Sequence, residues 1–342
     1  MKVLVRATNW VGDAVMSLPA IRAIRRAFPG WEVVLLARPW VAGLYARESS
    51  IDRVILLEGR GWPARLRTVR AVAAERCDAA ILLQNAFEAA LIARLAGIPR
   101  RIGYRRDGRG WLLTDAIAVP HAGELPAHER FYYLELLRRA GLIAEIPETN
   151  QIRLEGSAEA AAAGRNRLAA LGVPLPVVGV SPGAAYGTAK RWLPESFAVS
   201  AVELARHLGG SVAIFGSAGE RPLCEQVNAL VKAEKIPVAN LAGRTALEQF
   251  IEMAAACVVF LTNDSGAMHI ASALGVPTVT VFGATNHVTT GPTGANAAIV
   301  REPVDCSPCL LRECPIDHRC MTRVPPSRVV DEALHLIGGS SR

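Results

Sequence analysis

The candidate catalytic residues stand in loops that follow short apolar runs. Residues 8–13 (TNWVGD) come directly after the first such run, and Gly12 allows a tight turn before a helix that Asp13 opens. A carboxylate in this place could take a proton from a substrate hydroxyl. It could also be no more than a first-turn residue that stabilises the helix. The loop has no GxGxxG fingerprint, which disfavours a dinucleotide site.

A second loop, residues 182–192 (PGAAYGTAKRW), combines small residues with adjacent cations. Thr188, Lys190 and Arg191 lie in it, and the whole chain has only four lysines. Such a loop is suited to holding phosphate; the alternative is an ordinary solvated basic loop. The GxxxxGK[ST] order of a Walker loop is missing.

Two further loops place acids at helix starts. Ser265 and Gly266 stand at the first turn of a predicted helix, whose free N–H groups and dipole attract phosphate oxygens. Asp264 would repel phosphate, so we expect it to accept hydrogen bonds from sugar hydroxyls. His269 either belongs to this site or is a satisfied core histidine. In the loop 215–220, Glu220 suits a ribose diol, because a carboxylate can accept two hydroxyl donors.

Four of the seven cysteines form a C-x2-C-x4-C-x5-C cluster: Cys306, Cys309, Cys314 and Cys320. In a cytoplasmic protein, four thiols so close together favour a structural zinc or iron ion over disulfides. The spacings are tighter than in common zinc ribbons. Reduced, metal-free thiols or a redox-labile pair are therefore the alternatives.

The positive charge belongs to the first half of the chain. The formal net charge is +7; residues 1–150 hold 22 Lys+Arg against 15 Asp+Glu, and the remainder holds 16 against 16. Six arginines between residues 94 and 109 supply much of this excess. They suggest a landing site for a polyanionic acceptor or an anionic membrane surface, and the alternative is a solvated loop. No run approaches a membrane span or a signal peptide, so we expect a cytoplasmic protein.

The elements that must position these loops alternate in the pattern of parallel α/β layers. Strands are predicted at 3–5, 33–37, 54–57, 79–83, 177–181, 212–215, 258–262 and 278–282, with helix-length segments between them. A lapse at 142–157 reads as a linker. The sequence therefore predicts an α/β protein with two Rossmann-like domains facing a central cleft, and ligands beyond the carboxyl ends of the strands.

Five segments together resemble glycosyltransferase family 9, the ADP-heptose–lipopolysaccharide heptosyltransferases, and most closely the second-heptose enzymes. They are NWVGDAVMSLPAIRAIRRAFP, PGAAYGTAKRWLPESFA, LAGRTALEQFIEMAAAC, TNDSGAMHIASALGVPTVTVFG and DCSPCLLRECPIDHRCM. The resemblance implies a GT-B fold with an acceptor-binding domain at 1–155, an ADP-sugar-binding domain at 156–325 and a C-terminal helix at 326–342 packing back across the domains. First-heptose members carry a Thr pair before the lysine, where this chain has Ala184 and Ala185.

The resemblance also implies roles for single residues. Asp13 would be the general base, and Lys190 would counter the charge on the departing ADP. Glu220 would bind the ribose, and Thr245 would line the adenine. The segment that contains Asp264, Ser265, Gly266 and His269 would bind the donor sugar and the diphosphate. Domain closure would bring the base to the leaving group.

The implied reaction is an inverting transfer of heptose from ADP-L-glycero-D-manno-heptose to the inner-core heptose/Kdo region of lipopolysaccharide, the second heptose in particular. The implied partners are the donor, the lipid A-core acceptor and the anionic membrane surface, with no nucleic acid; because the acceptor lipid lies in the inner membrane, the protein would be peripheral on the inner face of that membrane. No cofactor is expected in catalysis, since the chain has no D-x-D triplet for a metal-bridged diphosphate. The alternatives are a family member with another sugar or acceptor, a nucleotide-sugar epimerase of the same fold, and a non-catalytic nucleotide-sugar binder.

Overall fold

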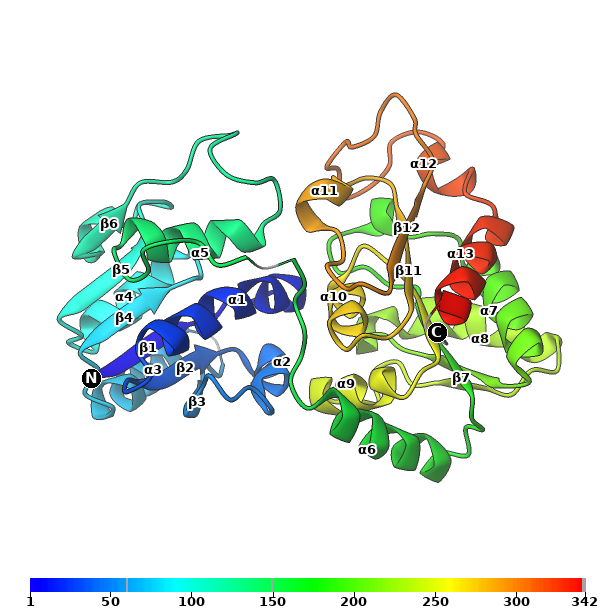
Figure 1. Cartoon of the computed structure of the whole chain (residues 1–342), viewed down its shortest axis with the longest axis horizontal. Coiled ribbons are helices and arrows are strands. Elements are labelled where there is room, and N and C mark those ends of the chain that lie inside the picture. The colour runs from blue at the N-terminus through cyan, green and yellow to red at the C-terminus, as the bar shows by residue number, and fades with distance from the viewer. Residues whose placement is uncertain (60, 149, 340–342) are drawn as a thin grey trace. The chain divides into compact units, whose positions relative to one another are not determined.

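The computed structural model describes residues 1–59, 61–148 and 150–339. The chain divides into two compact units, Met1–Ile152 and Arg153–Arg342 (Figure 1). Each unit is one parallel sheet covered by helices, as the alternating pattern predicted. Residues 340–342 of the predicted C-terminal helix segment lie outside the described residues.

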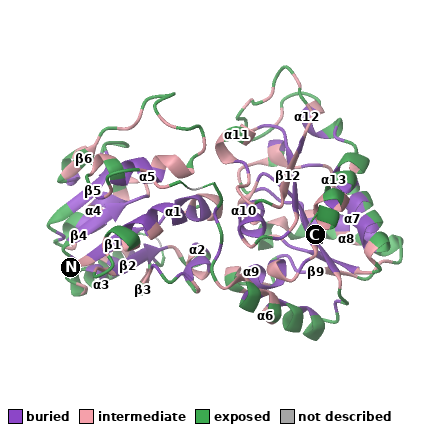
Figure 2. Ribbon diagram, in the orientation of Figure 1, coloured by how far each residue is buried: buried purple, intermediate pink, exposed green. Residues whose placement is uncertain are grey.

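The first unit contains a six-stranded parallel sheet in the order β3-β2-β1-β4-β5-β6. Its strands are β1 (Lys2–Arg6), β2 (Glu32–Ala37), β3 (Arg53–Leu56), β4 (Ala79–Leu82), β5 (Arg100–Tyr104) and β6 (Asp115–Ile117). The main helices are α1 (Val11–Ala27), α2 (Pro39–Ala42), α3 (Gly61–Ala74), α4 (Phe87–Leu95) and α5 (Arg130–Arg139). The central strands read as unbroken apolar runs because helices cover both faces of the sheet (Figure 2).

The second unit repeats this topology with the order β12-β11-β10-β7-β8-β9. Its strands are β7 (Val177–Ser181), β8 (Ser211–Ile214), β9 (Val238–Asn240), β10 (Val259–Asn263), β11 (Thr278–Phe282) and β12 (Ala297–Arg301). The helices are α6 (Ser157–Ala170), α7 (Pro194–Leu208), α8 (Arg221–Ala233), α9 (Leu247–Ala255), α10 (Gly266–Ala273), α11 (His287–Thr290), α12 (Arg319–Thr322) and α13 (Pro326–Gly339).

The strand order places the switch points of both sheets. In each unit the chain winds outward first to one side of the leading strand and then to the other, so the order reverses between β1 and β4 and between β7 and β10. Ligands of doubly wound sheets bind outside the carboxyl ends of the strands at this point. The fold therefore predicts a ligand-binding site in the loops that follow these four strands.

The C-terminal helix α13 belongs to the second unit. Its buried face contributes Val329, Val330 and Ala333 to the core that α7, β11 and β12 also line. The expectation that this helix also crosses onto the first domain stays a prediction.

The sequence pattern did not single out several elements. Strands β6 and β9 have three residues each, and β12 is a partly exposed edge strand, so their apolar signal is weak. Helix α6 is Ala-rich and follows directly on the predicted linker. It lies close against α9, where a Cβ at Gly164 would stand 1.9 Å from the Glu252 carbonyl oxygen. The helix α1 starts at Val11, which places Asp13 in its first turn as expected.

Candidate active site

The second unit brings Lys190 and Asp264 together at its switch point. Lys190 lies in the 3₁₀ turn Thr188–Lys190 after β7, and Asp264 follows the last residue of β10. The Lys190 Nζ is 2.6 Å from Asp264 Oδ2, with the two side chains 13% and 5% exposed. The Thr285 hydroxyl, from the loop after β11, also donates to Asp264 Oδ2. Three loops at one sheet edge therefore converge on this carboxylate.

Helix α10 begins beside this pair. Ser265 is its N-cap and Gly266 its first residue, and within the described residues no side-chain hydrogen bond caps the helix. The Ser265 hydroxyl lies 3.2 Å from that of Thr262. First-turn N–H groups and the helix dipole attract anionic oxygen, so this end of the helix and the Lys190 ammonium can face the same diphosphate. His269 is buried one turn further on.

Asn263 fixes the loop after β7, a role that the sequence pattern did not predict. Its buried side chain accepts from the Trp192 backbone N–H at 2.9 Å and donates to the Pro182 carbonyl oxygen at 2.7 Å. Trp192 itself is fully buried and anchors the far end of the loop. Because both the oxygen and the nitrogen of this buried side-chain amide are hydrogen-bonded, Asn263 holds the loop of Lys190 close to β10.

Glu220 reaches the same loop from the neighbouring strand. It stands in the turn Ala218–Glu220 after β8, where Ser217 donates both its backbone N–H and its hydroxyl to Glu220 Oε2, each at 2.8 Å. The other carboxylate oxygen lies over Gly183, where a Cβ would stand only 2.1 Å away. Glycine at this position is what allows the carboxylate to lie over the β7 loop.

The remaining predicted residues of this unit lie around these groups. Thr188 is exposed at the start of the 3₁₀ turn, and Arg191 donates to the Ala184 carbonyl oxygen at 3.4 Å. Thr245 is half-buried two residues before α9, which begins at Leu247.

Asp13 and Gly12 lie in the first unit, in the first turn of α1 after β1. The Asp13 side chain is half-buried. Burial, followed by the negative charge of Asp13, raises the pKa of the Tyr133 hydroxyl well above its usual value. The candidate base therefore lies near enough to α5, the helix that packs on α1, for its charge to act on the Tyr133 hydroxyl.

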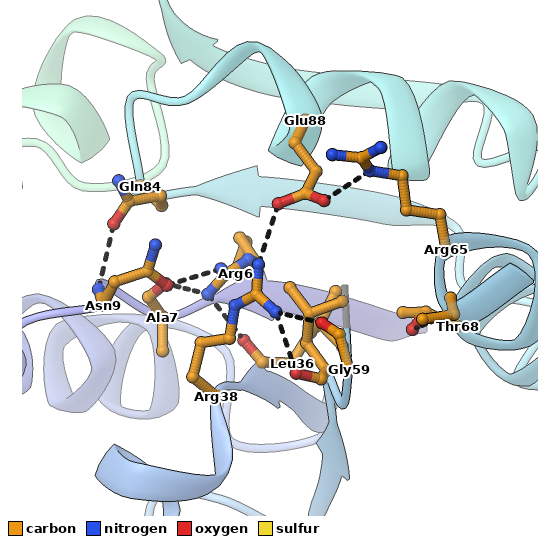
Figure 3. A network of polar contacts seen from close by, with 12 residues as sticks. Arg6, Ala7, Asn9, Leu36, Arg38, Gly59, Arg65, Thr68, Gln84 and Glu88 are labelled. Carbon is orange, nitrogen blue, oxygen red and sulfur yellow. Dashed lines mark hydrogen bonds and ion pairs between the residues drawn. The ribbon is translucent and has the colours of Figure 1, made fainter. Parts of the chain in front are cut away.

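A cationic network that the sequence analysis missed surrounds the β1/β4 switch point (Figure 3). Arg6 is 2% exposed and donates to Asn9 Oδ1 at 2.7 Å, while Asn9 N–H donates to Gln84 Oε1 at 3.0 Å. Arg38, at the end of β2, donates to Glu88 Oε2 at 3.0 Å. Burial, and then the charge of Arg38, lower the pKa of Arg6 to about 10, so it still carries its charge at neutral pH. The sequence contained one indication of this network, because the charged residue Arg6 ends the apolar strand KVLVR.

The six arginines between residues 94 and 109 do not form one patch, contrary to the expectation. Arg101 and Arg109 are buried and bond to the protein itself; Arg109, fully buried, donates to the Tyr104 carbonyl oxygen at 3.0 Å and to Asn85 Oδ1 at 2.9 Å. Arg100 opens β5, whereas Arg105 follows its last residue. Five residues of strand span roughly 16 Å, so Arg100 lies at the amino end of β5 and Arg105 beyond its carboxyl end.

The structure does not support the predicted metal site. Across residues 1–59, 61–148 and 150–339, no group of three or more His, Cys, Asp or Glu side chains is arranged to hold a metal ion. All four clustered cysteines are free; Cys306 is exposed, Cys309 and Cys314 are half-buried, and Cys320 is buried in the core of the unit. The segment does lie against the Lys190 loop.

Two doubly wound units with a lysine and a helix N-terminus at one switch point are the arrangement expected of a GT-B glycosyltransferase. The model of "Glycosyltransferase family 9 (heptosyltransferase)" matches residues 65–319. Lipopolysaccharide heptosyltransferase 2 of Salmonella typhimurium is 32% identical over 309 residues, 88% of each chain. The solved E. coli ADP-heptose lps heptosyltransferase II superposes with a TM-score of 0.84 at 28% identity over all of both chains. The E. coli heptosyltransferase WaaC with ADP, 19% identical, shares the fold with a TM-score of 0.72 over 98% of this chain and 100% of its own. The chain belongs to glycosyltransferase family 9.

Proposed function

We propose that this glycosyltransferase moves a heptose from ADP-L-glycero-D-manno-heptose to the inner core of lipopolysaccharide, as its second heptose, with inversion at the anomeric carbon. The observation that carries the proposal is the Lys190–Asp264 pair beside the start of α10. The similarity to heptosyltransferases 2 over most of the chain supports the choice of sugar and step.

The leaving ADP is stabilised by the second unit. An ammonium has three N–H donors, so Lys190 can keep its bond to Asp264 and still donate to a phosphate oxygen. The α10 N-terminus at Ser265 and Gly266 contributes its N–H groups to the same charge. Glu220 binds the ribose hydroxyls and Thr245 lines the adenine, while Asp264 and His269 face the donor sugar. Charge neutralisation comes from these groups, and no step is assigned to a cofactor.

The acceptor is handled by the first unit. Asp13 removes the proton of the attacking hydroxyl, and the charged network of Arg6 and Arg38 favours an anionic saccharide in front of the β1/β4 switch point. Within the described residues, the buried Nε atoms of both arginines have no hydrogen-bond partner.

The test is transfer from ADP-heptose to a core acceptor that already bears one heptose. We expect ADP release with a heptose-sized mass gain, and a loss of about 10²–10⁴-fold in kcat for Asp13→Asn with unchanged ADP affinity. Asp107→Asn, an exposed carboxylate of the same unit, is the matched control. Wild-type protein that binds ADP but transfers no heptose would refute the proposed donor or acceptor. An undiminished kcat in the Asp13→Asn variant would refute the role of Asp13 as the general base.

We also propose that the enzyme lies on the anionic membrane surface that carries its acceptor lipid. No helix in the described part of the chain is long and apolar enough to cross a bilayer. Arg105 and Arg106 are exposed beyond the carboxyl end of β5, and each basic residue near such a surface contributes about 1 kcal/mol. Replacing both by Ala should weaken flotation with anionic liposomes at low salt, whereas Arg94→Ala should not. Salt-independent binding, or none by the wild type, would refute this.

A further inference from the structure

The cysteine-bearing segment, residues 302–322, has no part in the proposed chemistry, yet it lies against the loops that perform it. It leaves β12 at Arg301 and ends in the short helix α12 (Figure 1). Between these points it contains little regular structure. Several of its hydrogen bonds go to the loops after β7 and β11.

The segment holds both polar backbone groups of Ala189, the residue before Lys190. The Ala189 N–H donates to the Arg312 carbonyl oxygen at 3.0 Å. The Ala189 carbonyl oxygen lies 3.0 Å from His318 Nε2. Because a carbonyl only accepts, the proton of the imidazole bond must be on Nε2. The peptide planes on either side of Ala189 are therefore fixed from the same segment.

Tyr186 and Gly187 extend this contact along the loop. The Tyr186 hydroxyl donates to the Leu310 carbonyl oxygen at 2.8 Å, and its ring lies 4.9 Å from Lys190 Nζ. A Cβ at Gly187 would stand 2.1 Å from the Arg312 carbonyl oxygen. Only glycine lets the two backbones approach so closely.

The same segment also binds the loop that supports Asp264. The Leu310 N–H donates to the Ala284 carbonyl oxygen at 2.8 Å, and the Ser307 hydroxyl donates to that of Gly283 at 2.7 Å. The next residue, Thr285, is the one that donates to Asp264. Both partners of the Lys190–Asp264 pair are thus held in place by contacts with one segment.

We propose that the segment 302–322 positions the Lys190 ammonium for catalysis, with His318 as its principal positioning residue. This inference rests on the proposed role of Lys190. Without the imidazole donor the Ala189 carbonyl loses its bond to the segment, and the 3₁₀ turn can move Lys190 away from the diphosphate. Small displacements of a group that stabilises the transition state cost up to about 10²-fold in rate.

The experiment compares His318→Ala with His318→Gln, each in the wild type and in a Lys190→Ala background. Both replacements meet the same left-handed backbone at residue 318, where φ is 55°, so their difference reports the side-chain donor. We expect His318→Ala to lower kcat by about 10–100-fold, with much of it recovered by Gln. In the Lys190→Ala background the same change should cost less than about twofold.

Equal losses in both backgrounds would overturn the inference and leave the proposed function standing. A Lys190→Ala enzyme with wild-type kcat would overturn the proposed role of Lys190 itself. Tyr186→Phe, which removes only the bond to Leu310, is the milder second variant should His318→Ala fail to fold. It should show the same dependence on Lys190, with an unchanged melting temperature, and additivity with Lys190→Ala would again refute the inference.

Discussion

Replacing Gly183 by alanine should weaken nucleotide binding by displacing Glu220. The added methyl would lie 2.1 Å from Glu220 Oε1 and 2.3 Å from its Cδ, whereas an ordinary contact needs about 3.5 Å. The carboxylate must therefore move by more than 1 Å. It cannot do so and keep both hydrogen bonds from Ser217 to Oε2.

The magnitudes follow from what is lost. The cap from Ser217 to Glu220 contributes about 1 kcal/mol, which in a unit of this size lowers the melting temperature by about 2–4 °C. If Glu220 holds the ribose, its displacement also removes hydrogen bonds from a charged acceptor. These contribute about 1.5–3 kcal/mol, or roughly 10–100-fold in the Kd for ADP.

The assay is calorimetric titration with ADP, together with thermal unfolding. Gly219→Ala is the matched control, because a Cβ there meets nothing within 4 Å. In a Glu220→Ala background, Gly183→Ala should change the Kd very little, since the displaced group is already gone. Unchanged ADP affinity in Gly183→Ala, or a full additional loss in the double variant, would show that Glu220 is not the group through which this position acts.

Other perturbations test the rest of the site. Lys190→Ala should lower kcat by about 10²–10³-fold in the transfer assay, and the exposed Lys232→Ala should not; equal kcat values for the two would contradict the proposed charge role. At pH 8 an alkylating reagent should modify exposed Cys306 well before Cys224 and Cys257, as read by mass spectrometry. Burial raises the pKa of Cys224 to about 12 and that of Cys257 further, which leaves almost no thiolate; labelling of all three at one rate would refute this. Elemental analysis of protein purified without added metal should find far less than one zinc or iron ion per chain, and a stoichiometric metal would restore the metal hypothesis for the clustered cysteines.

The elements that the sequence predicted best are the buried central strands. β1, β2 and β7 contain continuous apolar runs followed by glycine-bearing loops or helix starts, so burial on both faces is visible in the residue types. β11 (TVTVF) is equally buried and consists of β-branched residues and a phenylalanine, which favour strands. The edge strands β6 and β9 lack that signal because no residue of either is fully buried. Their existence depends on pairing with strands that are distant in the sequence.

The arginines and cysteines show where local composition was insufficient. Six arginines close in sequence suggested one surface, but β5 runs between them, so some lie at its amino end and others at its carboxyl end. Four cysteines close in sequence suggested one metal ion. Burial, and then the charges of Cys306, Cys309 and Cys314, raise the pKa of Cys320, so the thiols are neighbours, but within the described residues no three potential ligands are arranged to hold a metal ion. Proximity along the chain does not determine which way side chains face.

The fold class and the loops that carry the candidate chemistry could be predicted from the residue types alone, because strand burial, helix starts and glycine turns are local properties. The sequence named Lys190, Asp264 and Glu220 as separate residues in separate loops. The ion pair between Lys190 and Asp264, and the position of Glu220 over Gly183, depend on how the folded chain brings these loops together. The tertiary structure also shows that Arg6 and Arg38 place positive charge at the β1/β4 switch point, and that residues 302–322 form hydrogen bonds with the loop of Lys190. These contacts join residues tens to more than a hundred positions apart, and their partners are determined by sheet order and packing.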